Sequence, residues 1–510
     1  MAAALTRAGR EDYAPMNAAV LSDTERWPTL DAAALAQVRR LADEPGAPLW
    51  THRCGDRLTG ADLDALARFA ALVGDGSLAQ RSTGPQPHAV LAQEVVRPAL
   101  GTVPRYRALV RTAQLAPDAA LGDLPVADRE DLRRDVASFV PVDADLGRAV
   151  VGSSSGSTGA SLRFPVDPLA PAADVVLLRW WMDRLGISWD LDADRPQRLA
   201  LLQVVDQGEA FTYASAMTAH GPGAHMARVN LDSGAWRRPA DASRWLARHD
   251  PLVLSSAPLP LLRLAEAEPG LHPRLIVSGT SHLSAPARAR LERTWGVPVL
   301  DVYGLEECGM VSVDPDGTGG RIVPGVHVEV LDEDGRPVPE GRRGRLVVTT
   351  GTNPAMPLLR YDTGDRGAVV CRQCPDAPGG VECLITDLEG RATVRYRDAA
   401  GTWVPSVSLT QVLQARGAAV WSVHQDADGA LEVLAAGCRG DLTPDLAEEI
   451  RTGLAALLGQ PVGVQALSDS GRSSRRFTSS LPGHDGLGRV RGAGLGAPPQ
   501  PAWGRREDSS

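Results

Sequence analysis

The sequence predicts an α/β protein: a large N-terminal domain containing a β-rich subdomain, followed by a small, mobile α+β C-terminal domain. Between residues 150 and 327, short apolar runs alternate with helical patterns, which is typical of a largely parallel sheet. From residue 326, alternating strands surround an Asp-Gly turn, which indicates antiparallel hairpins. After Gly390 the pattern becomes strand, helix, strand, strand, helix, strand, enough for a separate lobe.

The composition is that of a soluble globular protein. The 510 residues are 43% hydrophobic and correspond to roughly two to four domains. The net charge of −9, with no block of one sign, argues against nucleic acid as a partner. No stretch approaches the ~18 apolar residues that span a membrane, and the first residues lack the apolar run of a signal peptide. We therefore expect a cytoplasmic protein without a membrane partner, and a homodimer remains an open possibility.

The chain contains no lysine, so all 53 basic residues are arginine. Arginine is planar and permanently charged, and it does not replace a flexible lysine ammonium in every role. Schiff-base chemistry on a lysine is therefore excluded.

The N-terminal part of the chain is predicted to be helical. Residues 1–87 form a helical N-terminal segment, with periodic apolar patterns at 30–43 and 61–74. A core domain follows over 88–388, and it opens with a helix over 129–139 for which Asp128 is placed as the N-cap.

The core domain is expected to hold strands at 199–205, 274–279 and 297–304 and helices at 172–185, 258–267 and 284–295. Hairpin strands follow from residue 326 and around 344–350. A small C-terminal lobe covers 389–482. Residues 483–510 are rich in Gly and Pro and poor in apolar anchors, which predicts a disordered tail.

One loop has the composition of a phosphate site. It follows a predicted strand and consists of Ser154, Ser155, Gly156, Ser157, Thr158 and Gly159. Glycine lets backbone N–H groups converge on an anion, and hydroxyl groups add donors. The loop lacks the Gly-Lys-Ser/Thr ending of a Walker loop, and a flexible surface loop is the alternative interpretation.

Two further polar segments lie at predicted strand ends. The segment 300–307 contains Asp301, Tyr303, Gly304 and a pair of glutamates, which offer a carboxylate for Mg²⁺ and a ring that can stack on a base. The segment 360–365 ends in Asp365, a carboxylate that could accept both hydroxyls of a ribose. Taken singly, each is also consistent with an ordinary exposed turn.

The order and spacing of these segments, with Ser278-Gly-Thr-Ser281 between them and Gly390-Arg391 after them, resembles the adenylate-forming superfamily over about residues 90–480. The segments RYRALVRTAQLAP, LGDLPVADREDLRRD and PLLRYDTGD are most similar to its phenylacetate-CoA ligase branch. The resemblance implies a large ATP-binding domain, a C-terminal lobe that swings over it, and a two-step reaction. A carboxylate and ATP give an acyl-adenylate and pyrophosphate, and a thiol then attacks.

The resemblance also implies roles for individual residues. The loop 154–159 would hold the phosphates, Thr158 and Glu307 would contact Mg²⁺, and Asp365 would bind the ribose. Nucleotide contacts would further come from Gly279, Thr280, Asp301, Tyr303, Gly304 and Arg391. The acyl group would meet residues of the strands near 200–220 and 254–282, with Gln203, Phe211, Tyr213, His220 and His282 as candidates.

Two lysines of the family pattern are missing. The loop ends Gly159-Ala160-Ser161 instead of Gly-Lys-Pro, and the C-terminal lobe offers only arginine in the stretch DSGRSSRRF. Either Arg472, or its neighbours Arg475 and Arg476, supplies the catalytic cation, or adenylation is slow, or the activity is lost. The paired acidic residues that follow the hinge Gly-Arg in the family are Ala392 and Thr393 here.

The cysteines suggest a zinc site. Cys371 and Cys374 have the Cys-x₂-Cys spacing of a tetrahedral zinc site, and Cys383 and Cys308 could complete it. The alternative is four reduced thiols, and a disulfide is not expected in a cytoplasmic protein.

Together these features predict an ATP-dependent, AMP-forming ligase that passes a small carboxylic acid to CoA, with aromatic acids among the candidate substrates. The alternatives are another acceptor or substrate, such as a carrier protein, an amine or nitrite for N–N bond formation in specialised metabolism, and a non-catalytic nucleotide-binding relative.

Overall fold

A computed structural model describes residues 21–154, 162–191, 195, 197–206, 211–267, 270–375, 377–390, 394–416, 418–437, 442–466 and 477–481. The helices are α2 (Asp23–Arg26), α3 (Ala32–Asp43), α4 (Gly60–Gly74), α5 (Ala89–Leu91), α6 (Arg97–Thr102), α7 (Pro104–Arg111), α8 (Arg129–Arg134), α9 (Leu169–Arg184), α10 (Ala242–His249), α11 (Pro258–Ala267), α12 (Ala285–Trp295), α13 (Ser406–Ala415) and α14 (Pro444–Leu458). No helix in these ranges is long and apolar enough to cross a membrane.

The strands are β1 (Val150–Ser154), β2 (Leu162–Val166), β3 (Leu201–Val205), β4 (Tyr213–Ala216), β5 (His225–Asn230), β6 (Val253–Ser256), β7 (Leu275–Ser278), β8 (Val299–Leu305), β9 (Gly309–Asp314), β10 (Gly320–Ile322), β11 (Val326–Leu331), β12 (Gly344–Thr350), β13 (Leu358–Gln373), β14 (Val381–Glu389), β15 (Arg395–Arg397), β16 (Trp403–Pro405), β17 (Ala418–Gln425), β18 (Leu431–Gly437), β19 (Val462–Ala466) and β20 (Phe477–Ser479).

One twelve-stranded sheet forms the centre of the large domain, in the order β11-β12-β13-β14-β10-β9-β8-β7-β6-β3-β5-β4. Strands β5, β3, β6, β7 and β8 are parallel to one another. From β8 to the edge strand β11, in the sheet order just given, each strand is antiparallel to its neighbour. The predicted β-rich subdomain is therefore continuous with the α/β sheet. The continuity arises because β8 turns directly into β9 and pairs with it.

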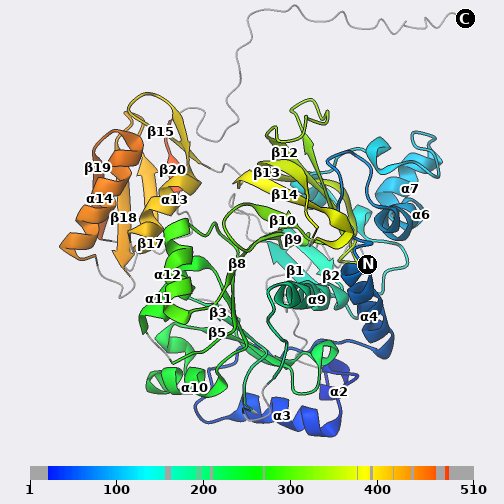
Figure 1. Cartoon of the computed structure of the whole chain (residues 1–510), viewed down its shortest axis with the longest axis horizontal. Coiled ribbons are helices and arrows are strands. Elements are labelled where there is room, and N and C mark those ends of the chain that lie inside the picture. Colours follow the sequence, from blue (N-terminus) through cyan, green and yellow to red (C-terminus); the bar gives the residue numbers. More distant parts are fainter. Residues whose placement is uncertain are drawn as a thin grey trace, which may run out of the picture.

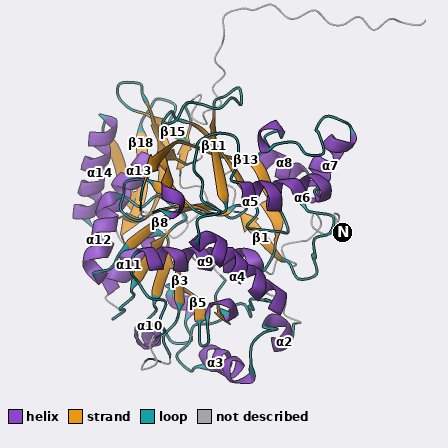
Figure 2. Cartoon of the chain, turned by 45° about the vertical axis from the view of Figure 1, so that its right-hand side comes forward, coloured by secondary structure: helices purple, strands orange, loops and turns teal. Residues whose placement is uncertain are grey.

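Helices cover the sheet, as Figure 2 shows, and the reason lies in their apolar faces. Helix α9 buries Leu177, Trp181 and Met182 in the largest core cluster. The early helices belong to the same body, since α3 packs against β4 and α4 packs against α9. The predicted N-cap of α8 is confirmed, because the Asp128 side chain accepts the N–H of Asp131 at 2.9 Å.

The C-terminal lobe has its own sheet, in the order β19-β18-β17-β20, with α13 and α14 beside it. It has a separate core cluster that includes Tyr396, Leu409 and Leu454. Figure 1 shows the lobe next to α11 and α12 of the large domain, and α13 contacts α12. The fold class is thus the predicted one: a large domain with a mixed sheet and a smaller C-terminal domain.

Candidate active site

Strands β8 and β13 bring two of the predicted nucleotide residues together. The Tyr303 hydroxyl donates a hydrogen bond of 2.7 Å to Oδ2 of Asp365, although 62 residues separate them. Asp365 is only 6% exposed, and its own N–H donates to Oγ1 of Thr363 at 3.0 Å. Burial and the nearby Asp365 carboxylate raise the pKa of Tyr303 well above its usual range, so its hydroxyl keeps the proton.

An irregularity in the pairing of β13 with β12, between Asp362 and Arg366, presents this carboxylate. Gly364 has a φ of +75°, which glycine adopts without strain, and its N–H donates to the Asp362 side chain at 2.9 Å. A Cβ added to Gly390 would lie 4.0 Å from Oδ1 of Asp365, so the start of the C-terminal lobe passes beside the same carboxylate. The pair therefore sits where the two domains adjoin.

Glu307 follows β8 and is buried, with 2% of its surface exposed. Its Oε1 accepts a hydrogen bond of 2.8 Å from the Tyr361 hydroxyl and lies 3.5 Å from an Arg129 guanidinium nitrogen. The described residues hold no cluster of three or more His, Cys, Asp or Glu side chains that could bind a metal ion. Mg²⁺ is commonly held by one or two carboxylates together with phosphate oxygens and water, and a single oriented Glu307 fits that donor set.

The residues that follow β7 include the predicted nucleotide contacts Gly279 and Thr280. The N–H of Gly279 donates to the Ser256 carbonyl at 3.1 Å, and Thr280 has a φ of +65°. Oδ2 of Asp301 accepts the N–H of Leu283 at 3.4 Å, so this carboxylate holds the loop that contains His282. Burial raises the pKa of Asp301 to about 6.

The acyl candidates separate into two groups. Phe211 stacks on Tyr213 with ring centroids 5.8 Å apart, and the Arg228 guanidinium lies 4.0 Å from the centroid of the Phe211 ring. His220 is instead packed against Trp189, with ring centroids 6.2 Å apart, and burial lowers its pKa to about 4. His220 is thus a buried imidazole packed beside Trp189, and its role in acyl binding stays a prediction.

The remaining acyl candidates are only partly placed. Gln203 is half-buried on β3, next to Arg228 of β5 in the parallel register, and His282 is exposed in the loop before α12. The roles of these two residues in acyl binding stay predictions.

The zinc prediction is wrong. Cys371 and Cys383 face each other across the β13–β14 register and form a disulfide, so their sulfurs are not thiolate ligands. Cys308 is buried in the main core cluster beneath the β8–β9 turn, and Cys374 lies in the connection after β13. The expectation that the chain has no disulfide is therefore also wrong for Cys371 and Cys383.

Several predicted residues lie outside the described part of the chain. These are Ser155, Gly156, Ser157, Thr158 and Gly159 of the loop, Arg391 at the hinge, and Arg472, Arg475 and Arg476. What is described is the frame of the loop, because β1 and β2 are antiparallel partners and Ser154 pairs with Leu162. Sequence reasoning missed Arg129, Arg228 and Tyr361, which become recognisable only when the sheet brings them next to predicted residues.

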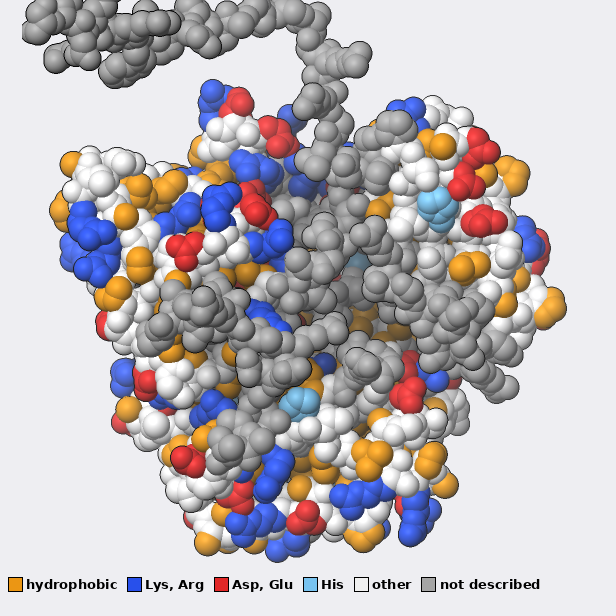
Figure 3. Space-filling view, turned by 180° about the vertical axis from the view of Figure 1, so that it is seen from behind, with side chains coloured by type: hydrophobic (Ala, Val, Ile, Leu, Met, Phe, Trp, Pro, Cys, Tyr) orange, Lys and Arg blue, Asp and Glu red, His pale blue; other side chains and the backbone are white. Residues whose placement is uncertain are grey.

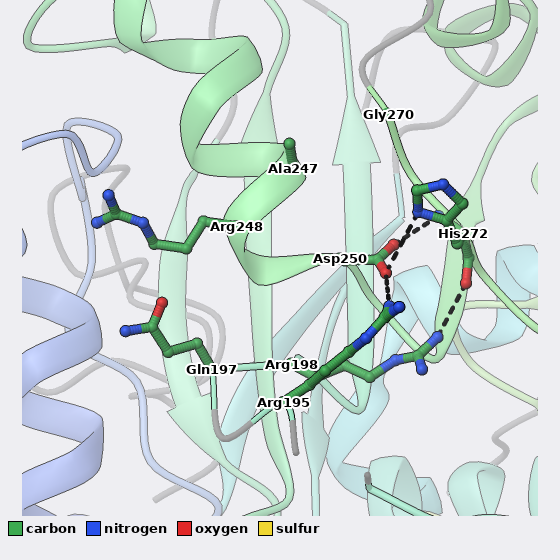
Figure 4. Close-up of a pocket in the computed structure, with 8 residues that line it drawn as sticks. All are labelled: Arg195, Gln197, Arg198, Ala247, Arg248, Asp250, Gly270 and His272. Carbon is green, nitrogen blue, oxygen red and sulfur yellow. Dashed lines mark hydrogen bonds and ion pairs between the residues drawn. The ribbon is translucent and has the colours of Figure 1, made fainter. Parts of the chain in front are cut away.

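A pocket of about 380 Å³ lies elsewhere, on the side of the sheet where β3 and β6 begin. Figure 4 shows its centre, where Asp250 is paired with Arg195 at 2.6 Å and lies 3.5 Å from His272. Ligands of open α/β sheets bind at the carboxyl ends of the strands, so this pocket is not the candidate active site. Acidic and basic side chains are mixed over the described part of the face in Figure 3.

Parts of the chain are similar to known proteins. The AMP-binding enzyme family model matches residues 196–355. A phenylacetate-coenzyme A ligase of Thermus thermophilus is 34% identical over 139 residues, which are 24% of this chain and 31% of the relative. A phenylacetate-coenzyme A ligase of Escherichia coli is 34% identical over 98 residues, or 18% of this chain and 22% of the relative. The matched segments thus span less than a third of these relatives.

The crystal structure of a 2-hydroxyisobutyryl-CoA ligase in its postadenylation state, in complex with 2-HIB-AMP, has a similar fold. The TM-score is 0.53 at 18% identity, and the alignment covers 83% of this chain and 90% of the other. At that identity the likeness establishes the fold alone.

Proposed function

We propose that the chain, which over part of its length is similar to AMP-binding enzymes and to phenylacetate-CoA ligases, is an AMP-forming ligase of small carboxylic acids. The acid is activated with ATP and the acyl group then passes to CoA. The observation that carries the proposal is the Tyr303–Asp365 hydrogen bond, which places an aromatic ring and a buried carboxylate side by side. Such a pair can take a purine face and ribose hydroxyls.

The proposed reaction has two displacements. A carboxylate oxygen of the acid attacks the α-phosphorus of ATP, and the bond to the β-phosphate oxygen breaks to release pyrophosphate. The thiolate of CoA then attacks the acyl carbon, and AMP leaves. Both steps need little covalent help from the protein, so catalysis rests on positioning and on charge neutralisation.

The described residues supply the positioning. Asp365 would hold the ribose, and Glu307 would hold a Mg²⁺ ion, which when bound neutralises phosphate charge. The Arg472 cation, the phosphate contacts of residues 154–159 and the role of Arg391 remain predictions. Phe211, which stacks on the buried Tyr213, offers an aromatic surface to the acyl group, and this supports an aromatic or similarly flat acid.

The test is ATP–pyrophosphate exchange over a panel of acids, with phenylacetate, benzoate, short aliphatic acids and nitrite as separate arms. We expect exchange that requires an acid and Mg²⁺, followed by formation of a CoA thioester. Exchange with an acid but no thioester would point to a carrier protein or an amine as acceptor. Nucleotide binding without exchange in any arm would contradict the ligase proposal and favour a non-catalytic relative.

A further inference from the structure

Two side chains contact one oxygen of the Glu307 carboxylate. Both the Tyr361 hydroxyl, at 2.8 Å, and the Arg129 guanidinium, at 3.5 Å, contact the same oxygen, Oε1. The Glu307 side chain is 1% exposed, whereas the Arg129 side chain is 20% exposed. The two contacts restrict the rotation of the buried carboxylate.

Main-chain hydrogen bonds hold the start of α8, where Arg129 lies. Just before α8, the N–H of Ala127 donates to the Arg360 carbonyl at 3.0 Å, and the N–H of Asp362 donates to the Ala127 carbonyl at 2.7 Å. Ala127 is thereby bridged to Tyr361 as a short parallel strand. Arg129 and Tyr361 consequently approach Glu307 as one rigid unit.

A carboxylate that serves as a metal ligand must be held in one orientation. The Arg129 guanidinium, at 3.5 Å, carries a permanent positive charge, and the Tyr361 hydroxyl donates a directional hydrogen bond. The groups that hold a ligand in place commonly decide metal affinity as strongly as the ligand itself.

We propose that Arg129 is a positioning residue for nucleotide-bound Mg²⁺: with Tyr361 it holds the Glu307 carboxylate, through Oε1, in the orientation that meets the ion. The inference rests on the proposed function, because it requires ATP at the site. It makes α8, which precedes the phosphate loop in the chain, a part of the nucleotide site. It also gives the lysine-free N-terminal domain a fixed positive charge next to the metal ligand.

The test is a Mg²⁺ titration of ATP binding to the full chain, followed by intrinsic tryptophan fluorescence or calorimetry, with no acid present. Arg129→Gln should raise the Mg²⁺ concentration for half-maximal ATP binding by about 10-fold or more, the loss typical of outer-shell partners. Arg129→Lys should recover part of that loss. The matched control is Arg133→Gln, on the same helix, whose side chain is 41% exposed and pairs with Glu130.

The possible outcomes distinguish a failure of the positioning role of Arg129 from a failure of the proposed function. If wild-type protein binds ATP in a Mg²⁺-dependent manner and Arg129→Gln has the same Mg²⁺ dependence as Arg133→Gln, the positioning role is refuted. If Arg129→Gln does not fold, the decision falls to Arg129→Lys and Tyr361→Phe, both of which should shift the Mg²⁺ midpoint in the same direction. If wild-type protein binds no ATP at any Mg²⁺ concentration, the proposed function itself fails.

Discussion

The buried ion pair between Glu329 and Arg360 should hold β11 and β13 together. Arg360 donates to both oxygens of Glu329 at 3.0 Å, and it also donates to the carbonyls of Gly122 and Leu124. Glu329 is 2% exposed and Arg360 is 7% exposed. Glu329→Gln keeps the shape of the side chain but leaves a guanidinium buried without its counter-charge.

Removing one partner of a buried pair typically costs about 3–5 kcal/mol. The equilibrium for opening this part of the sheet should therefore rise roughly 10²- to 4 × 10³-fold, since every 1.4 kcal/mol is about tenfold. The assay is native-state hydrogen exchange of the β11 and β13 amides, because the C-terminal lobe has its own core and can unfold separately.

The control for this prediction is Asp334→Asn. Asp334 pairs with Arg336, and both side chains are more than two-thirds exposed, so exchange should stay near wild type. The double variant Glu329→Gln/Arg360→Gln should lose less than the sum of the two single variants, because the uncompensated charge is gone. Protection of the Glu329→Gln variant within threefold of wild type would refute the reasoning.

Three further predictions concern the site and its surroundings. Asp365→Asn should weaken ATP binding by at least 10-fold without unfolding the protein, since bonds to a charged acceptor contribute roughly 1.5–3 kcal/mol each; equal ATP affinity in calorimetry would show that Asp365 does not bind the nucleotide. Burial raises the pKa of Asp174 from 3.8 to about 6, so the folded state binds this proton more tightly than the unfolded state, and stability should fall as pH rises from about 4 to 6. In urea titrations Asp174→Asn should flatten that part of the pH profile, and an unchanged profile would contradict the assignment. Peptide mapping without reductant should find Cys371 joined to Cys383, whereas four alkylatable thiols and a bound zinc ion would restore the original prediction.

Part of the fold could be predicted because the signals are local. The helices α3, α4 and α9, the Asp128 N-cap and the strand-helix alternation around β7 and β8 follow from periodicity and capping. The continuity of the two halves of the sheet could not be predicted, because it depends on β8 pairing with both β7 and β9.

The candidate site divides in the same way. Tyr303, Glu307 and Asp365 could be chosen because each lies in a short motif whose residue types suit a nucleotide. Arg129 and Arg228 could not be chosen, since nothing in their local sequence separates them from the other arginines. The cysteine spacing was misleading, because Cys-x₂-Cys fits zinc, while the antiparallel register of β13 and β14 pairs Cys371 with Cys383.

The sequence by itself determined the fold class, the order of the elements, the absence of lysine and the residue types of the nucleotide motifs. All of these depend on composition or on neighbours within a few residues. Only the tertiary structure decided that Tyr303 bonds to Asp365 and that Glu307 is held by Arg129 and Tyr361. These contacts join residues 54 to 178 positions apart, and their geometry depends on strand register and burial, which a linear pattern does not encode.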